Sequence, residues 1–202
     1  MKQLIAIGAL ALAMLAAPVA AQEAAPDTSG IVDMFIGPED AKVTIIEYAS
    51  YTCPHCANFH NGPFKQLKAD YLDNDKVKFV YRDVYFDRFG LWASMVARCG
   101  GPEKFFGITD MIYEQQREWT SGDPSSIADN LRRIGKVAGI EPDALEACLN
   151  DNDNAKALVA YYQANAETHD VNSTPTFIIN EQKYSNMAYD DLKAIIEEKL
   201  AE

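Results

Sequence analysis

The chain has 202 residues, and its hydrophobic share of 48% and charged share of 24% are those of a folded globular protein. Its formal net charge of −12 argues against a nucleic-acid-binding protein, which needs positive charge to displace counterions from phosphates. The same charge argues against a polybasic membrane anchor. The length predicts one domain, or one domain that carries an insertion.

The N-terminus has the layout of a secretory signal peptide. Lys2 precedes an uncharged, mostly apolar run over residues 4–17, and Pro18-Val19-Ala20-Ala21 supplies a helix breaker and small residues. The run is short for a membrane span of about 20 residues, so we expect cleavage of residues 1–21 near Ala21 rather than an uncleaved anchor. Residues 22–30 form a flexible lead-in. Export predicts an oxidising compartment, where cysteine pairs persist.

Strand and helix patterns alternate in the first part of the mature chain. The β-branched, apolar run over residues 43–49 is typical of a buried central strand, although Glu47 interrupts it. The other expected elements are a strand over residues 31–36, a helix from Cys53 to about Leu72 with a kink at Gly62-Pro63, and a strand over residues 76–86.

Residues 87–170 are almost entirely helical in pattern. Asp123-Pro124 and Glu141-Pro142 have the form of helix starts. A strand over residues 176–179, a short partner strand over residues 181–185 and a closing helix over residues 190–200 follow. The fold class is therefore α/β: one mixed sheet, formed by residues 31–86 and 171–202, with residues 87–170 as a helical insertion.

The motif with the clearest chemistry is Cys53-Pro54-His55-Cys56, which follows a buried-type strand and opens a helix. Free backbone N–H groups at the helix N-terminus stabilise an anion, so the pKa of the Cys53 thiol should fall. Pro54 suits the first helical position, and His55 adds donor capacity near the sulfur. Cys56 lies one turn further in. Cys53 is therefore the exposed attacking thiolate and Cys56 the resolving thiol.

Other uses of these cysteines are weaker. A c-type haem site needs His directly after Cys56, where Ala57 stands. A zinc site could recruit Cys53, Cys56 and His60 but lacks a recognisable fourth ligand. A purely structural disulfide would close too short a loop to stabilise the chain much. We therefore expect no metal and no cofactor.

The segment from Glu47 to Cys56, Glu-Tyr-Ala-Ser-Tyr-Thr-Cys-Pro-His-Cys, resembles the active site of the DsbA-type thiol oxidases, exported members of the thioredoxin superfamily. A second matching element starts at Thr174-Pro175, and the helical block between them resembles the family's insertion. The resemblance implies a thioredoxin-like fold and a cis Thr174–Pro175 bond that faces the disulfide. The sequence departs from the family at Ser173, where Gly is frequent, and at Asn180-Glu181, where Asn-Gly is frequent.

The residues themselves agree with this resemblance. Pro175 at a strand start leaves the ladder without a donor, and the backbone of Thr174 stays free to bind an extended substrate chain. Glu47 is costly on a buried strand unless it has a role. We expect it to relay protons to or from Cys56; the alternative is a Glu that reaches solvent at a strand edge.

Two further cysteines, Cys99 and Cys148, lie on apolar faces of expected helices. In an oxidising compartment such a pair is expected to form a structural disulfide; buried free thiols and a regulatory redox pair are the alternatives. His60 and His169 have no obvious partner and receive no role.

Three aromatic residues near the motif have two possible places. Tyr48, Tyr51 and Phe59 could line an apolar rim around the active disulfide or pack in the core. The sequence alone does not separate these alternatives.

The resemblance implies a periplasmic thiol:disulfide oxidase. Such an enzyme donates the Cys53–Cys56 disulfide to reduced, unfolded exported proteins and is reoxidised by a quinone-linked membrane partner of the DsbB type. An isomerase or reductase of the same fold is the first alternative. Isomerases of this type usually carry an N-terminal dimerisation module, and the short stretch of residues 22–30 before the first strand argues against that arrangement and for a monomer. A non-catalytic exported metal or protein binder is the second.

Overall fold

The computed structural model describes residues 25–202. The predicted signal peptide and the first residues of the lead-in lie outside this range. Residues 25–33 contain no helix or strand. Within the described range, no helix combines the length and the apolar character that a membrane span requires.

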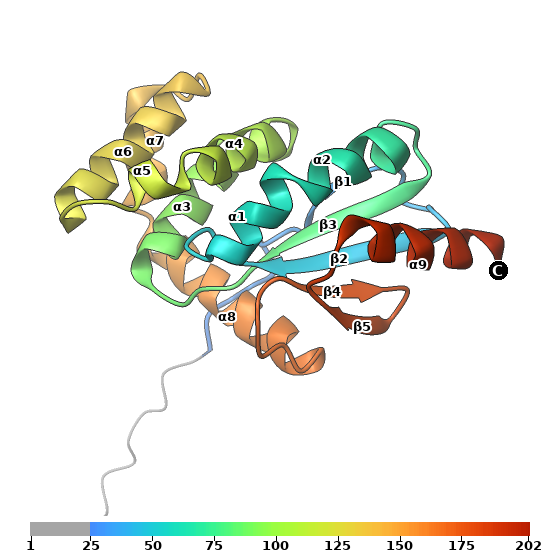
Figure 1. The fold of residues 1–202 in the computed structure, drawn as a ribbon. Coiled ribbons are helices and arrows are strands. Elements are labelled where there is room, and N and C mark those ends of the chain that lie inside the picture. Colours follow the sequence, from blue (N-terminus) through green and yellow to red (C-terminus); the bar gives the residue numbers. More distant parts are fainter. Residues whose placement is uncertain (1–24) are drawn as a thin grey trace, which may run out of the picture.

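A mixed five-stranded sheet forms the centre of the molecule (Figure 1). Its order is β1-β3-β2-β4-β5, with β2 parallel to β3 and the other neighbours antiparallel. The predicted α/β sheet is confirmed. The strands are β1 (Met34–Ile36), β2 (Val43–Ala49), β3 (Val77–Asp83), β4 (Thr176–Ile179) and β5 (Gln182–Ser185). The predicted β1 and β3 were too long, because β1 pairs with β3 only over residues 34–36 and the chain leaves the sheet after Asp83.

The helices form two groups, one near β2 and one between β3 and β4 in the chain. Those near β2 are α1 (Pro54–Asn61), α2 (Pro63–Leu67), the π-helical η1 (Lys68–Leu72) and the C-terminal α9 (Tyr189–Ala201). Those between β3 and β4 are α3 (Arg88–Cys99), α4 (Pro102–Glu114), α5 (Gln116–Trp119), α6 (Pro124–Val137), α7 (Pro142–Leu149) and α8 (Asn152–Thr168). The predicted kink at Gly62-Pro63 is a break between two helices, because Pro63 supplies no N–H to continue the ladder.

The two faces of the sheet have separate hydrophobic clusters. The larger one packs the face of β2 that carries Val43, Ile45 and Ala49 against α1, α2, α4 and α9, and continues into α6 and α7. The smaller one centres on Tyr48 and includes residues of α8, which covers the opposite face (Figure 1). Since side chains alternate along a strand, Glu47 faces the larger cluster together with α1.

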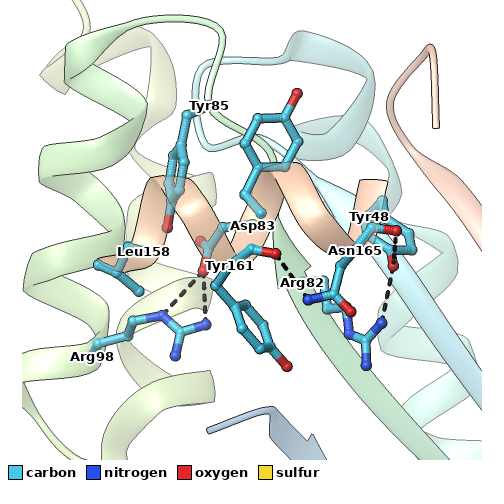
Figure 2. Close-up of a pocket in the computed structure, with 9 residues that line it drawn as sticks. Tyr48, Arg82, Asp83, Tyr85, Arg98, Leu158, Tyr161 and Asn165 are labelled. Atoms are coloured by element: carbon cyan, nitrogen blue, oxygen red, sulfur yellow. Dashed lines mark hydrogen bonds and ion pairs between the residues drawn. The ribbon is translucent and has the colours of Figure 1, made fainter. Parts of the chain in front are cut away.

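A charged network lies under α8 (Figure 2). Arg82 donates to the Tyr48 hydroxyl over 3.0 Å and to the Asp33 carboxylate over 2.7 Å. Nearby, Arg98 donates to the Asp83 carboxylate over 2.9 Å. A small pocket lined in part by Arg82, Asp83 and Arg98 measures about 10 Å³, room for at most one water molecule. The network therefore neutralises charges that the packing of α8 removes from solvent.

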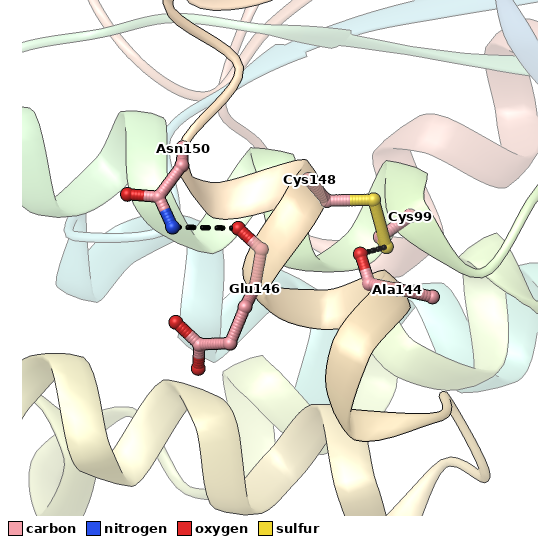
Figure 3. Close-up of a disulfide and its surroundings, with 5 residues drawn as sticks. All are labelled: Cys99, Ala144, Glu146, Cys148 and Asn150. Atoms are coloured by element: carbon pink, nitrogen blue, oxygen red, sulfur yellow. Dashed lines mark hydrogen bonds between the residues drawn. A yellow bond between two sulfur atoms is a disulfide. The ribbon is translucent and has the colours of Figure 1, made fainter.

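A disulfide joins Cys99, the last residue of α3, to Cys148 in α7 (Figure 3). The two cysteines are 49 positions apart. The bond therefore closes a long loop that contains α4, α5 and α6, and it ties the two ends of that loop together.

The β4–β5 turn explains one departure from the family pattern. Asn180 and Glu181 both adopt positive φ, 42° and 71°, a conformation that favours Asn followed by Gly. The Asn180 amide accepts a hydrogen bond from the Thr44 N–H and donates one to the Lys42 carbonyl. These bonds to the start of β2 hold the turn in place although Glu181 stands where Gly would be unstrained.

Candidate active site

Cys53 lies at the junction between the central strand and α1. The chain turns after β2, and the Cys53 N–H donates to the Ser50 carbonyl over 3.0 Å. Cys53 occupies the N-cap position of α1, and Pro54 occupies the first helical position. Cys53 is only 8% exposed. The expectation of an exposed cysteine was therefore wrong, because the surrounding loops leave only a small part of this residue accessible.

The two thiols of the motif have opposite environments. Both are unpaired, so the structure represents the dithiol state. A hydrogen bond from the Cys56 thiol, helped by the backbone N–H groups of Cys56 and His55, lowers the pKa of Cys53 to about 5. Burial raises the pKa of Cys56 strongly, and the Cys53 sulfur and the nearby Glu47 carboxylate add to this effect. Cys53 is therefore the thiolate at neutral pH, and Cys56 remains protonated.

The side chain of His55 is exposed. Its backbone N–H, not its imidazole, provides the interaction with the Cys53 sulfur that the structure shows. This differs in detail from the predicted role of the ring.

The loop before β4 lies against Cys53. The Thr174–Pro175 peptide bond is cis, and the Thr174 carbonyl oxygen is 3.5 Å from the Cys53 Sγ. Pro175 is buried, while Thr174 is partly exposed. The sequence-predicted residues Cys53, Thr174 and Pro175 therefore meet at one place, although 121 positions separate Cys53 from Thr174.

Glu47 is fully buried under the motif, on the face of β2 that packs against α1. Its Oε2 is 2.8 Å from His60 Nε2. The alternative of a Glu that reaches solvent is wrong, because no part of Glu47 is exposed. The view of His60 and His169 as residues without partners is also wrong: His169 Nδ1 is 2.6 Å from the Tyr48 hydroxyl. Sequence spacing did not show these pairs because each joins a helix to a strand.

The aromatic residues near the motif pack in the core. Tyr48, Tyr51 and Phe59 are at most 2% exposed, so they do not form the accessible rim that was one of the two alternatives. Tyr51 donates to or accepts from Thr109 over 2.8 Å, which places its hydroxyl inside the helical insertion.

Gln116, in α5, is a site residue that sequence analysis missed. Its Nε2 donates to the Tyr51 carbonyl over 2.7 Å and to the Cys53 carbonyl over 3.0 Å. The side chain is 7% exposed. It therefore fixes the backbone on both sides of Thr52. Nothing in the local sequence marks it, because a polar residue at the start of a short helix is usually exposed.

Replacement of this amide should loosen the active-site loop. We expect Gln116→Leu to lower the free energy of unfolding by about 1–3 kcal/mol, because two buried carbonyl groups lose a donor. It should also slow thiol exchange at Cys53. Urea denaturation and the rate of reaction with oxidised glutathione measure both effects. Gln163→Leu on the exposed face of α8 is the matched control, and equal behaviour of the two variants would show that Gln116 does not hold the loop.

Among residues 25–202, no cluster of three or more His, Cys, Asp or Glu side chains is arranged to hold a metal ion. His60, the third candidate zinc ligand, has its Nε2 on the Glu47 carboxylate instead. The chemistry that the described arrangement can perform is thiol–disulfide exchange between Cys53 and Cys56.

Comparisons with known proteins agree with this chemistry. The family model described as Thioredoxin matches residues 29–198. A Rickettsia bellii protein named as a protein-disulfide oxidoreductase is 32% identical over 84% of this chain, and disulfide bond formation protein D of Bacillus subtilis is 28% identical over 82% of this chain and 76% of its own length. This chain spans 65% of the length of the R. bellii protein and 61% of a second relative from Rickettsia felis.

Solved structures show the same architecture. Wolbachia pipientis alpha-DsbA1 superposes with a TM-score of 0.77 at 24% identity, covering 84% of this chain and 91% of its own. B. subtilis BdbD in its oxidised form gives a TM-score of 0.75 at 24% identity, covering 88% and 96%. These structures confirm the thioredoxin-like fold, and the family model and sequence relatives confirm the resemblance to the DsbA-type oxidoreductases. The chain belongs to the thioredoxin family.

Proposed function

We propose that this protein is a periplasmic thiol:disulfide oxidase that donates the Cys53–Cys56 disulfide to exported proteins as they fold. One observation carries the proposal: Cys53 lies at the N-cap of α1, where the Cys56 thiol and the N–H groups of Cys56 and His55 lower its pKa to about 5, while burial raises the pKa of Cys56. A stabilised Cys53 thiolate favours the dithiol over the disulfide, and a disulfide with a favoured dithiol state is a strong oxidant.

The exchange proceeds in two steps. A client thiolate attacks Cys53 Sγ, the Cys53–Cys56 bond breaks, and Cys56 leaves as a thiolate that takes up a proton. A second client thiolate then attacks the client sulfur of the mixed disulfide, and Cys53 leaves as the stable thiolate. The client loses two electrons and gains a disulfide, and the enzyme gains both electrons.

The remaining predicted residues have supporting roles in this proposal. Pro54 fixes the start of α1, and Glu47 exchanges the proton with Cys56. The free backbone of Thr174, beside Pro175, pairs with an extended client chain next to Cys53. A DsbB-type membrane partner linked to quinones takes the electrons, and the protein works as a monomer without a cofactor.

The equilibrium with glutathione tests the proposal. Purified protein in buffers of defined glutathione ratio, followed by alkylation and mass measurement, gives the reduction potential of Cys53–Cys56. We expect a value near the figure of about −120 mV known for DsbA. A value near the figure of about −270 mV for thioredoxin would instead identify a reductase, and scrambled-substrate refolding faster than oxidation would identify an isomerase.

A further inference from the structure

The exchange at Cys53 and Cys56 leaves one buried titratable group beside it without a role. His60 lies in α1, one turn beyond Cys56, and is 1% exposed. Its Nε2 is 2.8 Å from the Oε2 of Glu47, which is 0% exposed. The pair therefore joins the helix that carries Cys56 to the strand beneath it.

Each member of this pair keeps one polar atom without a partner. Among the described residues, neither Oε1 of Glu47 nor Nδ1 of His60 has a hydrogen-bond partner. Buried polar atoms are nearly always paired, and an unpaired one costs free energy. A pair that served packing alone would be replaced by apolar side chains at little or no cost. Each of these two atoms is therefore free to make one further hydrogen bond.

Groups around His60 lead from the buried pair toward the protein surface. The ring stacks on Tyr113 of α4 with centroids 4.3 Å apart, and the Tyr81 ring of β3 is 5.8 Å away. Asp110 lies one turn before Tyr113 in α4 and is partly exposed. Burial raises the pKa of Asp110, whereas the charge of His60 lowers it, so the two groups interact.

The other charged groups near Asp110 lie toward the surface. Lys65 of α2, Lys68 of η1 and Glu114 of α4 act on Asp110. Toward the interior, the Glu47 carboxylate raises the pKa of Cys56. The order from the inside outward is therefore Cys56, Glu47, His60 and Asp110.

We propose that His60 and Glu47 together hold the proton that Cys56 exchanges during each redox cycle, and that His60 passes it between Glu47 and the solvent near Asp110. His60 acts through Glu47 and does not touch the reacting sulfurs. The inference rests on the proposed exchange at Cys53–Cys56 but not on its direction.

The proton balance is the same in both directions. When the Cys53–Cys56 bond breaks, the leaving Cys56 thiolate takes one proton from the Glu47–His60 pair, and the pair regains one from solvent at His60 Nδ1. When the disulfide reforms, the Cys56 thiol gives its proton to Glu47, its sulfur attacks Cys53 Sγ, and the thiolate bound to Cys53 leaves. The proton then departs through His60.

The second step of oxidation by glutathione isolates this transfer. Reduced protein is mixed with oxidised glutathione, quenched with acid and separated by mass, which resolves formation of the Cys53–glutathione mixed disulfide from its attack by Cys56. His60→Gln keeps a donor to Glu47 but cannot titrate. We expect the rate of the second step in this variant to be about tenfold below the wild-type rate at pH 6. This rate should rise tenfold per pH unit, whereas the wild-type rate stays nearly constant. The first step should not change.

Three comparisons make the test specific. His169→Gln, on the opposite face of the sheet, should match the wild type. Glu47→Gln should show the same loss as His60→Gln, and the double variant should lose no more than either single one, because the two residues act as a unit. A second-step pH profile of His60→Gln that is parallel to the wild-type profile would overturn the proposal.

A wild-type measurement covers the case in which His60→Gln fails to fold. The ¹⁵N chemical shifts of the His60 ring, which report the position of its proton, should differ between the dithiol and disulfide states. Identical shifts in both states would also overturn the proposal. A thioredoxin-like reduction potential would reject the oxidase but leave both of these results unaffected, so the two failures are distinguishable.

Discussion

Reduced protein titrated from pH 3 to pH 9 is expected to gain the ultraviolet absorbance of one thiolate with a midpoint near pH 5. The reason is the lowered pKa of Cys53, about 5 against an ordinary value of 9.0. Cys56 should contribute nothing in this range, because burial raises its pKa. Alkylation by iodoacetamide should follow the same curve, flat above pH 6 and falling below pH 5.

The sign of the linked effect follows from the direction of this shift. A folded-state pKa below the unfolded value stabilises the folded dithiol form fully above about pH 9, and this contribution is lost as the pH falls through about 5. At pH 7, a Cys53 pKa of about 5 favours the dithiol over the disulfide by about 100-fold more than the ordinary pKa of 9.0 would. Cys53→Ala should abolish the absorbance change. A midpoint near 8 or 9 would contradict both the site geometry and the oxidase.

Loss of the disulfide between α3 and α7 should have the largest effect on stability. We expect Cys99→Ala/Cys148→Ala to lower the free energy of unfolding by about 4 kcal/mol, because the bond closes a loop of about 50 residues whose entropy the unfolded chain then regains. The melting temperature should fall by about 8–16 °C. Urea denaturation checks the value.

The stability measurement must change only the Cys99–Cys148 disulfide. Both proteins should carry Cys53→Ala/Cys56→Ala, so that the active pair forms no bond in either. The Cys53 titration, measured separately in Cys99→Ala/Cys148→Ala, should keep its midpoint because this bond lies in the helical insertion. A difference in stability below about 1 kcal/mol would show that strain or residual structure cancels the loop entropy.

Local chemistry explains which parts of the site were predictable. The Cys53-Pro54-His55-Cys56 motif combines a helix start with two thiols at one-turn spacing, so its place follows from backbone physics and its acidity from the Cys56 thiol and the nearby backbone N–H groups. Pro124 and Pro142 begin helices as expected, because Pro at the first helical position loses no hydrogen bond.

Long-range partners explain what the sequence did not reveal. His60 is 13 positions from Glu47, and Gln116 is 63 positions from Cys53. Each pair forms only when helices pack on the sheet, and neither residue type predicts burial. The exposure of Cys53 was overestimated for the same reason, since the loop at Thr174 that partly covers it comes from the far end of the chain.

The position of β4 in the sheet has a consequence for the order of assembly. Strand β2 (Val43–Ala49) pairs with β3 on one side and with β4 (Thr176–Ile179) on the other. During synthesis, more than 120 residues after β2 must be made before β4 can pair with that second side. Until then β2 presents an unpaired edge, the feature on which strands of other chains assemble, and Cys53 lacks the cover of Thr174. The nascent protein therefore has the same needs as its proposed clients: protection from aggregation and from premature thiol chemistry.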